Sequence, residues 1–145
     1  MAYQHLLIPT DGTEVTAKAV ESAVMLARAL GARLSTITVK EPFPYSAISE
    51  MQPIPPQEFY DAQDRIATQR VKAVVDAAAT AGMACAAFVV EAPHPWEAIV
   101  DHAKNEGCDL IVMASHGRRG MSAMLLGSET TRVLTHTNVP VLVVR

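Results

Sequence analysis

Five short apolar runs recur along this 145-residue chain, and they set its first-order organisation. They are rich in Val, Ile, Leu and Ala, and most carry little of the strict polar alternation that marks a half-buried strand. Each run therefore predicts a strand that is buried on both faces. The runs lie at residues 5–9, 33–39, 84–90, 109–114 and 139–144.

Segments with apolar residues at helical spacing separate these runs. Thr13 is the predicted N-cap of the first helix and Gly31 its C-terminal stop, while a second helix is expected from about residue 57 to residue 81. His94 and Pro95 predict the start of a third helix, and Ser128 is the predicted N-cap of a fourth that ends near His136. The predicted apolar stripes are Ala17, Val20, Val24 and Ala27; then Ala67, Val71, Val74 and Ala78; then Trp96, Ile99, Val100 and Ala103.

The resulting order is βαβαβαβαβ, which predicts an α/β fold with a parallel sheet covered by helices on both faces. The segment KEPFPYSAISEMQPIPPQE is rich in proline and lacks a period, so we expect a long surface loop there. No internal repeat or linker interrupts the pattern, so we expect a single domain over residues 1–145.

Composition excludes several classes of partner. A formal net charge of -3 with mixed signs argues against nucleic acid or an anionic membrane as a partner. No apolar run approaches the ~20 residues of a membrane span, and the start lacks a basic n-region, so we expect a cytoplasmic protein. Cys85 and Cys108 form no CxxC pair and are expected to be buried free thiols, and the five histidines show no metal-ligand spacing.

A doubly wound sheet binds ligands beyond the carboxyl ends of its strands, where the strand order reverses. The segment PTDGT follows the first strand, and SHGRRGMSAMLLGS follows the fourth. If these two strands are neighbours, both segments border one crevice. The kinase-type pattern GxxxxGK[ST] and a GxGxxG after the first strand are both absent, which argues against a P-loop or dinucleotide site.

The second of these segments has the chemistry of an anion cradle. Gly117, Gly120 and Gly127 allow main-chain N–H groups to approach an oxyanion, and Ser128 adds a hydroxyl at a helix start. Arg118 and Arg119 would add positive charge, and Asp11 would offer an acceptor for a ribose hydroxyl or a base N–H. Ordinary turn glycines, a capping aspartate and solvated arginines explain the same residues without a ligand.

The motifs LIPTDGT, VMASHGRRGMSAMLLGS and NVPVLVVR, taken together, resemble the universal stress protein family, and the resemblance covers the entire chain. The ATP-binding branch of that family carries Gly-x2-Gly-x9-Gly-[Ser/Thr]. That pattern maps here onto Ala114, Gly117, Gly127 and Ser128, with alanine in place of the first glycine. The resemblance implies a three-layer, Rossmann-like sandwich of the adenine-nucleotide alpha-hydrolase type, with a five-stranded parallel sheet in the order 3-2-1-4-5.

The same resemblance implies a site for ATP or another adenine nucleotide, accompanied by Mg²⁺. Asp11 would meet the ribose or adenine, the main chain of Val39 would meet adenine, and Gly117, Gly127 and Ser128 would hold the phosphates. A β-branched residue at Gly127 is expected to fill the phosphate position. The full set of expected nucleotide contacts is Pro9, Thr10, Asp11, Val39, Met113, Ala114, His116, Gly117, Arg118, Arg119, Gly127, Ser128, Glu129 and Thr130.

The function favoured at this stage is a homodimeric ATP-binding protein of stress response or signalling, whose nucleotide occupancy changes its shape or its protein partners. The family commonly pairs its last strand between subunits, which would be residues 139–144 here. Two alternatives stay open: a slow ATP hydrolase or phosphotransfer enzyme with His116 as base, and a nucleotide-free structural dimer. No catalytic residue and no protein metal ligand is assigned.

Overall fold

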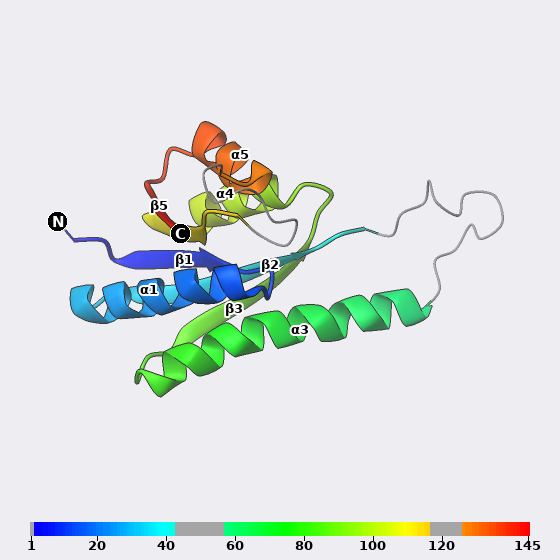
Figure 1. The fold of residues 1–145 in the computed structure, drawn as a ribbon, viewed down its shortest axis with the longest axis horizontal. Coiled ribbons are helices and arrows are strands. Elements are labelled where there is room, and N and C mark those ends of the chain that lie inside the picture. The colour runs from blue at the N-terminus through cyan, green and yellow to red at the C-terminus, as the bar shows by residue number, and fades with distance from the viewer. Residues whose placement is uncertain (1, 43–56, 117–125) are drawn as a thin grey trace.

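A computed structural model describes residues 2–42, 57–116 and 126–145. Its elements follow the predicted βαβαβαβαβ order (Figure 1): β1 His5–Pro9, α1 Glu14–Leu30, β2 Arg33–Lys40, α3 Gln57–Thr80, β3 Cys85–Glu91, α4 Pro95–Asn105, β4 Leu110–Ala114, α5 Ser128–His136 and β5 Val141–Val144. The predicted proline-rich loop lies largely outside the described residues.

The five strands form one parallel sheet in the order β3-β2-β1-β4-β5. Strand β1 is central and pairs with β2 from His5↔Arg33 to Pro9↔Ile37, and with β4 at Leu6↔Leu110 and Leu7↔Ile111. The expected strand order is therefore confirmed.

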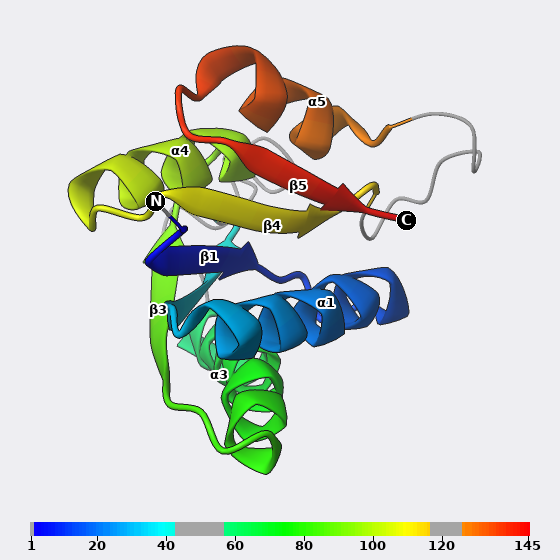
Figure 2. The same cartoon turned by 90° about the vertical axis from the view of Figure 1, so that its left-hand side faces the viewer.

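Helices cover both faces of the sheet (Figures 1 and 2), with α1 and α3 on one face and α4 and α5 on the other. Side chains of β1 alternate between the two cores, because successive strand residues point to opposite faces. Leu6 and Ile8 pack with α1 and α3, while Leu7 packs with Ile99 and Val133 of the α4 and α5 layer. The core is thus built from small aliphatic residues, as the composition predicts.

Most predicted helix boundaries are confirmed by the backbone. The Thr13 side chain accepts a hydrogen bond from Thr16 N, and Gly31 takes the left-handed conformation at φ 68° that favours glycine. His94 is the N-cap of α4, with Pro95 in its first turn. The prediction of Ser128 as an N-cap is wrong, because Gly127 is the N-cap and Ser128 is the first residue of α5.

In the predicted stripe of α1, Val20, Val24 and Ala27 are confirmed and Ala17 is wrong. Ala17 is exposed, and the buried face of α1 consists of Thr16, Ala19, Val20, Ala23, Val24 and Ala27. Thr16 tolerates burial because its hydroxyl donates to Thr13 O at 2.8 Å, which satisfies the polar group inside the protein. The stripe of α3 is confirmed, since Ala67, Val71, Val74 and Ala78 are all buried.

The amino end of the sheet holds a buried polar cluster. His5 Nε2 lies 2.7 Å from Ser35 Oγ, and His5 Nδ1 lies 3.7 Å from Cys108 Sγ and 3.5 Å from Arg33 Nη2. Burial, followed by the nearby Arg33 guanidinium, lowers the pKa of His5 below its usual value. The neutral ring is therefore the form that the fold accommodates.

Both cysteines are free, as expected, but only Cys108 is fully buried, while Cys85 is half-buried. Burial raises the pKa of each thiol to about 11, so neither is a reactive thiolate near neutral pH. In the part of the chain that the structure describes, no helix has the length and apolar character that a membrane crossing requires.

Candidate nucleotide site at the reversal of strand order

The strand order reverses at β1, because the chain continues to β2 on one side and later reaches β4 on the other. The β1–β4 register, extended along both strands, brings Pro9 and Thr10 level with Met113 and Ala114. The segments that follow β1 and β4 therefore leave the sheet side by side. This is the position at which open α/β sheets bind ligands.

Asp11 lies at the corner between β1 and α1, and its carboxylate is oriented by local hydrogen bonds. Its Oδ1 accepts from Thr13 N at 3.0 Å, from Thr13 Oγ1 at 2.7 Å and from Thr16 Oγ1 at 3.2 Å. Such bonds fix the turn, and the carboxyl group is half-buried where the chain leaves β1. The turn role that the sequence left open for Asp11 is therefore present, while Thr13 is the N-cap of α1.

Two buried threonines of β2 that the sequence analysis did not select hold the end of β1 in place. Thr36 Oγ1 donates to Ile8 O and Thr38 Oγ1 donates to Thr10 O, each at 2.8 Å. Thr10 is itself buried, and its N–H donates to Ile37 O at 2.9 Å. The presence of threonines in an otherwise apolar strand was the sequence feature that could have predicted these hydrogen bonds.

Val39 lies two residues beyond Ile37, which pairs with Pro9 at the end of the β1–β2 register. Lys40 O accepts from Ala92 N, so the main-chain groups of Lys40 face β3. Since alternate residues of a strand direct their main-chain groups to opposite sides, those of Val39 face the side on which β1 ends. The main chain of Val39 is thus directed toward the crevice.

The start of α5 is attached directly to the end of β4. Gly127 N donates to Ser115 O at 2.7 Å, and Thr130 Oγ1, from a buried side chain, donates to Ala114 O at 2.8 Å. A Cβ at Gly127 would lie 2.9 Å from His116 Cα. A side chain at Gly127 would therefore meet the main chain at His116 first, which corrects the expectation that it would simply fill the phosphate position.

The first turn of α5 presents main-chain donors. The α-helical hydrogen bonds of α5 begin at Thr131, whose N–H donates to Gly127 O at 3.0 Å. The N–H groups of Ser128, Glu129 and Thr130 precede it and have no carbonyl one turn earlier within the helix. Together with the positive end of the helix dipole, they form the kind of terminus that binds anions.

Four more residues of the expected site belong to β1, to β4 or to the segment after β4. Ala114 is buried at the end of β4, and no non-glycine residue within 2–42, 57–116 and 126–145 has a positive φ. Its main chain therefore does not need glycine. Pro9 and Met113 are buried in strands, and His116 Nδ1 lies 3.1 Å from Ser115 Oγ.

Glu129 does not point into the crevice. Its Oε2 accepts from Trp96 N, in the first turn of α4, at 2.7 Å, and its Oε1 lies 3.9 Å from Arg132 Nη1. Gly117, Arg118, Arg119 and Gly120 lie outside the described residues.

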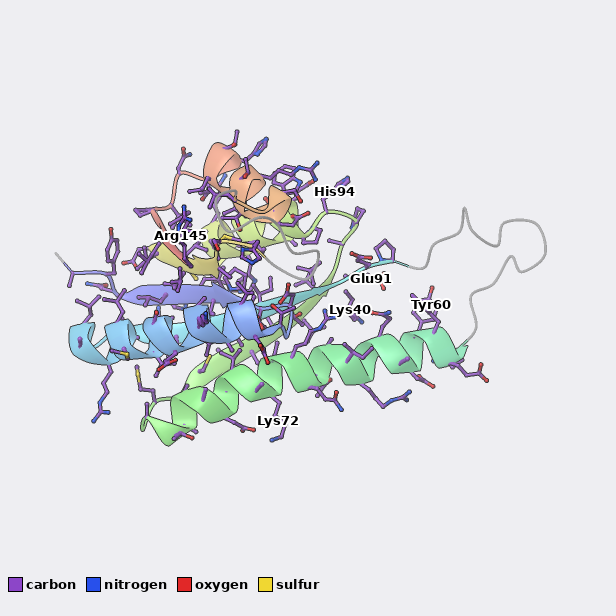
Figure 3. All side chains as sticks on the ribbon, viewed as in Figure 1. Lys40, Tyr60, Lys72, Glu91, His94 and Arg145 are labelled. Carbon is purple, nitrogen blue, oxygen red and sulfur yellow. The ribbon has the colours of Figure 1, made fainter. Side chains whose placement is uncertain are left out.

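Charged residues lie at the carboxyl ends of β2 and β3. Figure 3 shows Lys40, Glu91 and His94 toward this edge of the sheet. Lys40 Nζ contacts Asp64 Oδ1 of α3 at 2.7 Å, so α3 holds this cation. No group of three or more His, Cys, Asp or Glu side chains suited to a metal ion occurs among the described residues.

Two hollows occur in the described surface. One of about 290 Å³ is lined by Val90, His94, Glu97 and Asp101, beside α4 and the end of β3. The other, of about 810 Å³, lies at the opposite, amino end of the sheet and is lined by His5, Arg28, Arg33 and Ser35 among others. Neither contains the main-chain donors at the start of α5.

Comparison with known proteins agrees with this geometry. The model of the universal stress protein family matches residues 2–145. The universal stress protein YxiE of Bacillus subtilis is 29% identical over 148 residues and 99% of both chains, and the universal stress protein MJ0531 of Methanocaldococcus jannaschii is 31% identical over 99% of this chain and 82% of its own length.

Solved structures share the fold. The structure of the protein MJ0577 superposes with a TM-score of 0.80 at 28% identity, over 99% of this chain and 96% of that chain. A universal stress protein solved in complex with cAMP superposes with a TM-score of 0.69 at 27% identity, over 100% and 98% of the two chains. The sandwich is accordingly the adenine-nucleotide alpha-hydrolase-like fold that the sequence led us to expect.

Proposed function

We propose that this chain, which belongs to the universal stress protein family, binds an adenine nucleotide, with ATP as the first candidate, where β1 and β4 separate. The observation that carries this proposal is the attachment of α5 to β4. The bonds from Gly127 N to Ser115 O and from Thr130 Oγ1 to Ala114 O hold the donors of the first α5 turn at the end of β4, the strand next to β1.

In this proposal the nucleoside lies between Asp11 and Val39. Asp11 would accept from a ribose hydroxyl, because its carboxylate is already oriented by Thr13 and Thr16. The main chain of Val39 would recognise the adenine edge beyond the end of β1. The solved relative in complex with cAMP supports an adenine nucleotide as the ligand class.

The phosphates would meet the N–H groups and hydroxyl of Ser128 and the N–H groups of Glu129 and Thr130. Gly117, Arg118 and Arg119 are proposed to complete the phosphate site. Mg²⁺ would be held mainly by the phosphate oxygens, since the described residues offer no protein cage for it. The bound metal would neutralise part of the phosphate charge.

Nucleotide occupancy is proposed to set the shape of a cytoplasmic homodimer and its affinity for a protein partner in stress response or signalling. A binding role is favoured over phosphoryl transfer, because that chemistry requires a positioned base or water-orienting group. Among the described residues, the hydrogen-bond partner of His116 Nδ1 is the Ser115 hydroxyl and not a carboxylate that would orient the ring.

Calorimetric titration of ATP, ADP and AMP into nucleotide-stripped protein tests the proposal, with Ser128→Asp as the diagnostic variant. Ser128 is exposed at the first position of α5, where an acid favours the helix dipole. The fold should therefore keep its melting temperature, while the added carboxylate repels the phosphates. We expect affinity for ATP to fall at least about tenfold.

Gln69→Glu is the matched control, because it adds the same charge on the exposed side of α3. It should leave affinity unchanged. Absence of binding heat for every adenine nucleotide with the wild-type protein would refute the proposal. Equal affinities for Ser128→Asp and Gln69→Glu would place any nucleotide away from the start of α5.

A further inference from the structure

We infer that Glu129 is a positioning residue of the proposed nucleotide site, which ties the phosphate-binding turn of α5 to the first turn of α4. This inference rests on the proposed function. It adds which side chain fixes the position of the first α5 turn and how Trp96 would report a bound nucleotide. The Glu129 side chain is directed to the start of α4. Glu129 Oε2 accepts from Trp96 N at 2.7 Å, whereas an acid pointing into the crevice would repel a phosphate.

The first turn of α4 depends on this acceptor. His94 is the N-cap of α4 but makes no side-chain capping bond, and Pro95 has no N–H to donate. Trp96 therefore carries one of the first main-chain donors of α4, and a carboxylate from another helix satisfies it. A carboxylate is the favoured partner at a helix N-terminus, because the dipole end is positive there.

A second contact joins the same two helices. The rings of Trp96 and His136 stack, with centroids 4.3 Å apart and planes 29° apart. Glu129 and His136 are seven positions apart on α5, which is about two helical turns, so they project from one face. The helix α5 thus contacts the first turn of α4 near both of its own ends.

These contacts link the proposed phosphate donors to a surface outside the crevice. Thr130, next to Glu129, is bonded to Ala114 O, so the first α5 turn is held by β4 on one side and by α4 on the other. A ligand that shifts this turn also shifts Trp96. Since Trp96 is the single tryptophan of the chain, its emission reports this contact.

Positioning and simple charge repulsion predict different results for two substitutions. Glu129→Gln removes the charge but keeps an oxygen that accepts from Trp96 N. Glu129→Ala removes both. If Glu129 acted only through its negative charge, both variants would bind ATP more tightly and to the same degree. If it positions the turn, Glu129→Ala should bind about tenfold more weakly than Glu129→Gln.

The experiment is calorimetric titration of ATP with Mg²⁺ into nucleotide-stripped wild type, Glu129→Gln, Glu129→Ala and Glu97→Gln, with tryptophan emission recorded at each step. Glu97→Gln is the charge control, since Glu97 is an exposed acid of the same α4 turn. We expect an emission change at saturation in wild type, Glu129→Gln and Glu97→Gln, and its loss in Glu129→Ala, which still binds at high ATP. Melting curves verify that each variant is folded.

The outcomes separate the two proposals. If the wild type binds ATP while Glu129→Ala matches or exceeds Glu129→Gln in affinity, the positioning role is overturned and the nucleotide site stands. The positioning role is equally overturned if Glu129→Ala retains the full emission change. If the wild type binds no adenine nucleotide, the proposed function fails and this inference fails with it.

Discussion

Close packing against His116, and not backbone conformation, requires a glycine at position 127. Its φ of -64° is open to any amino acid, so backbone conformation does not require glycine. A Cβ there would instead lie 2.9 Å from His116 Cα and 3.2 Å from His116 Cβ. Gly31 is the opposite case, because its φ of 68° favours glycine while nothing lies within 4 Å of the added Cβ.

This contrast predicts different costs for Gly127→Ala and Gly31→Ala. Gly127→Ala should lower the free energy of unfolding by about 1–3 kcal/mol through overpacking and should weaken ATP binding as the β4–α5 corner shifts. Gly31→Ala should cost about 1 kcal/mol through backbone strain and leave binding unchanged. Urea unfolding with calorimetry checks both. Equal effects on binding would contradict the crowding argument.

At the scale of elements, β1 is held at both ends by polar contacts. Thr36 and Thr38 fix its carboxyl end near the site, and His5 fixes its amino end through Ser35. The Asp109 carboxylate accepts from Gln4 N and His5 N, each at 2.9 Å. Burial alone would raise the pKa of Asp109, but these main-chain bonds outweigh it and lower that pKa. The anchoring of β1 therefore depends on neutral His5 and ionised Asp109.

The buried His5 ring predicts a loss of stability in mild acid. Burial first, and Arg33 second, lower the folded-state pKa of His5 below its usual value of 6.5. The unfolded chain therefore binds a proton that the folded chain excludes. The free energy of unfolding should fall as pH decreases below about 6.5, and the loss should be complete below the folded-state pKa.

Urea unfolding at a series of pH values between 7.5 and 5 checks this expectation. His5→Asn should flatten the dependence, although it lowers stability at every pH by loss of the ring contacts. His102, whose pKa burial also lowers, leaves a residual slope. His94→Asn, at an exposed position, is the control and should retain the wild-type slope. A His5→Asn slope equal to that of the wild type would refute the role of His5.

At the scale of the whole molecule, the sheet ends in two edge strands, β3 and β5. Both carry an exposed apolar side chain, with Val89 and Leu142 each 41% exposed. Edge strands of this kind can pair with another chain. The proposed homodimer uses β5, and the equal exposure of the two residues provides a matched test of that choice.

Leu142→Lys should convert the dimer to monomers, because a charge on a paired edge is costly to bury, while Val89→Lys should leave the dimer intact. Sedimentation velocity at several protein concentrations measures both. Removal of β5 would be a poorer test, since β5 pairs with β4 from Ile111↔Val141 to Ala114↔Val144 and its loss would expose the core. Dimers in Leu142→Lys together with monomers in Val89→Lys would assign the interface to β3.

The sequence by itself determined the order of elements, most helix caps and the buried stripe of α3, and it predicted a ligand site where β1 and β4 end. These features follow from local signals: hydrophobic period, capping residues and the rule that parallel strands share a carboxyl edge. The family motif then predicted an adenine nucleotide as the ligand class. Each of these signals lies within a few residues of the position that it predicts, so the prediction requires no knowledge of tertiary contacts.

Only the tertiary structure decided which groups meet across the chain. It showed Thr16 buried in place of Ala17, Gly127 packed against His116, Glu129 directed to Trp96, and His5 bonded to Ser35. In most of these cases the partners are far apart in sequence. The hydrophobic period of the chain does not predict which residue a polar or small side chain will contact. Packing and hydrogen-bond geometry select such pairs, because each depends on the final placement of two separate elements.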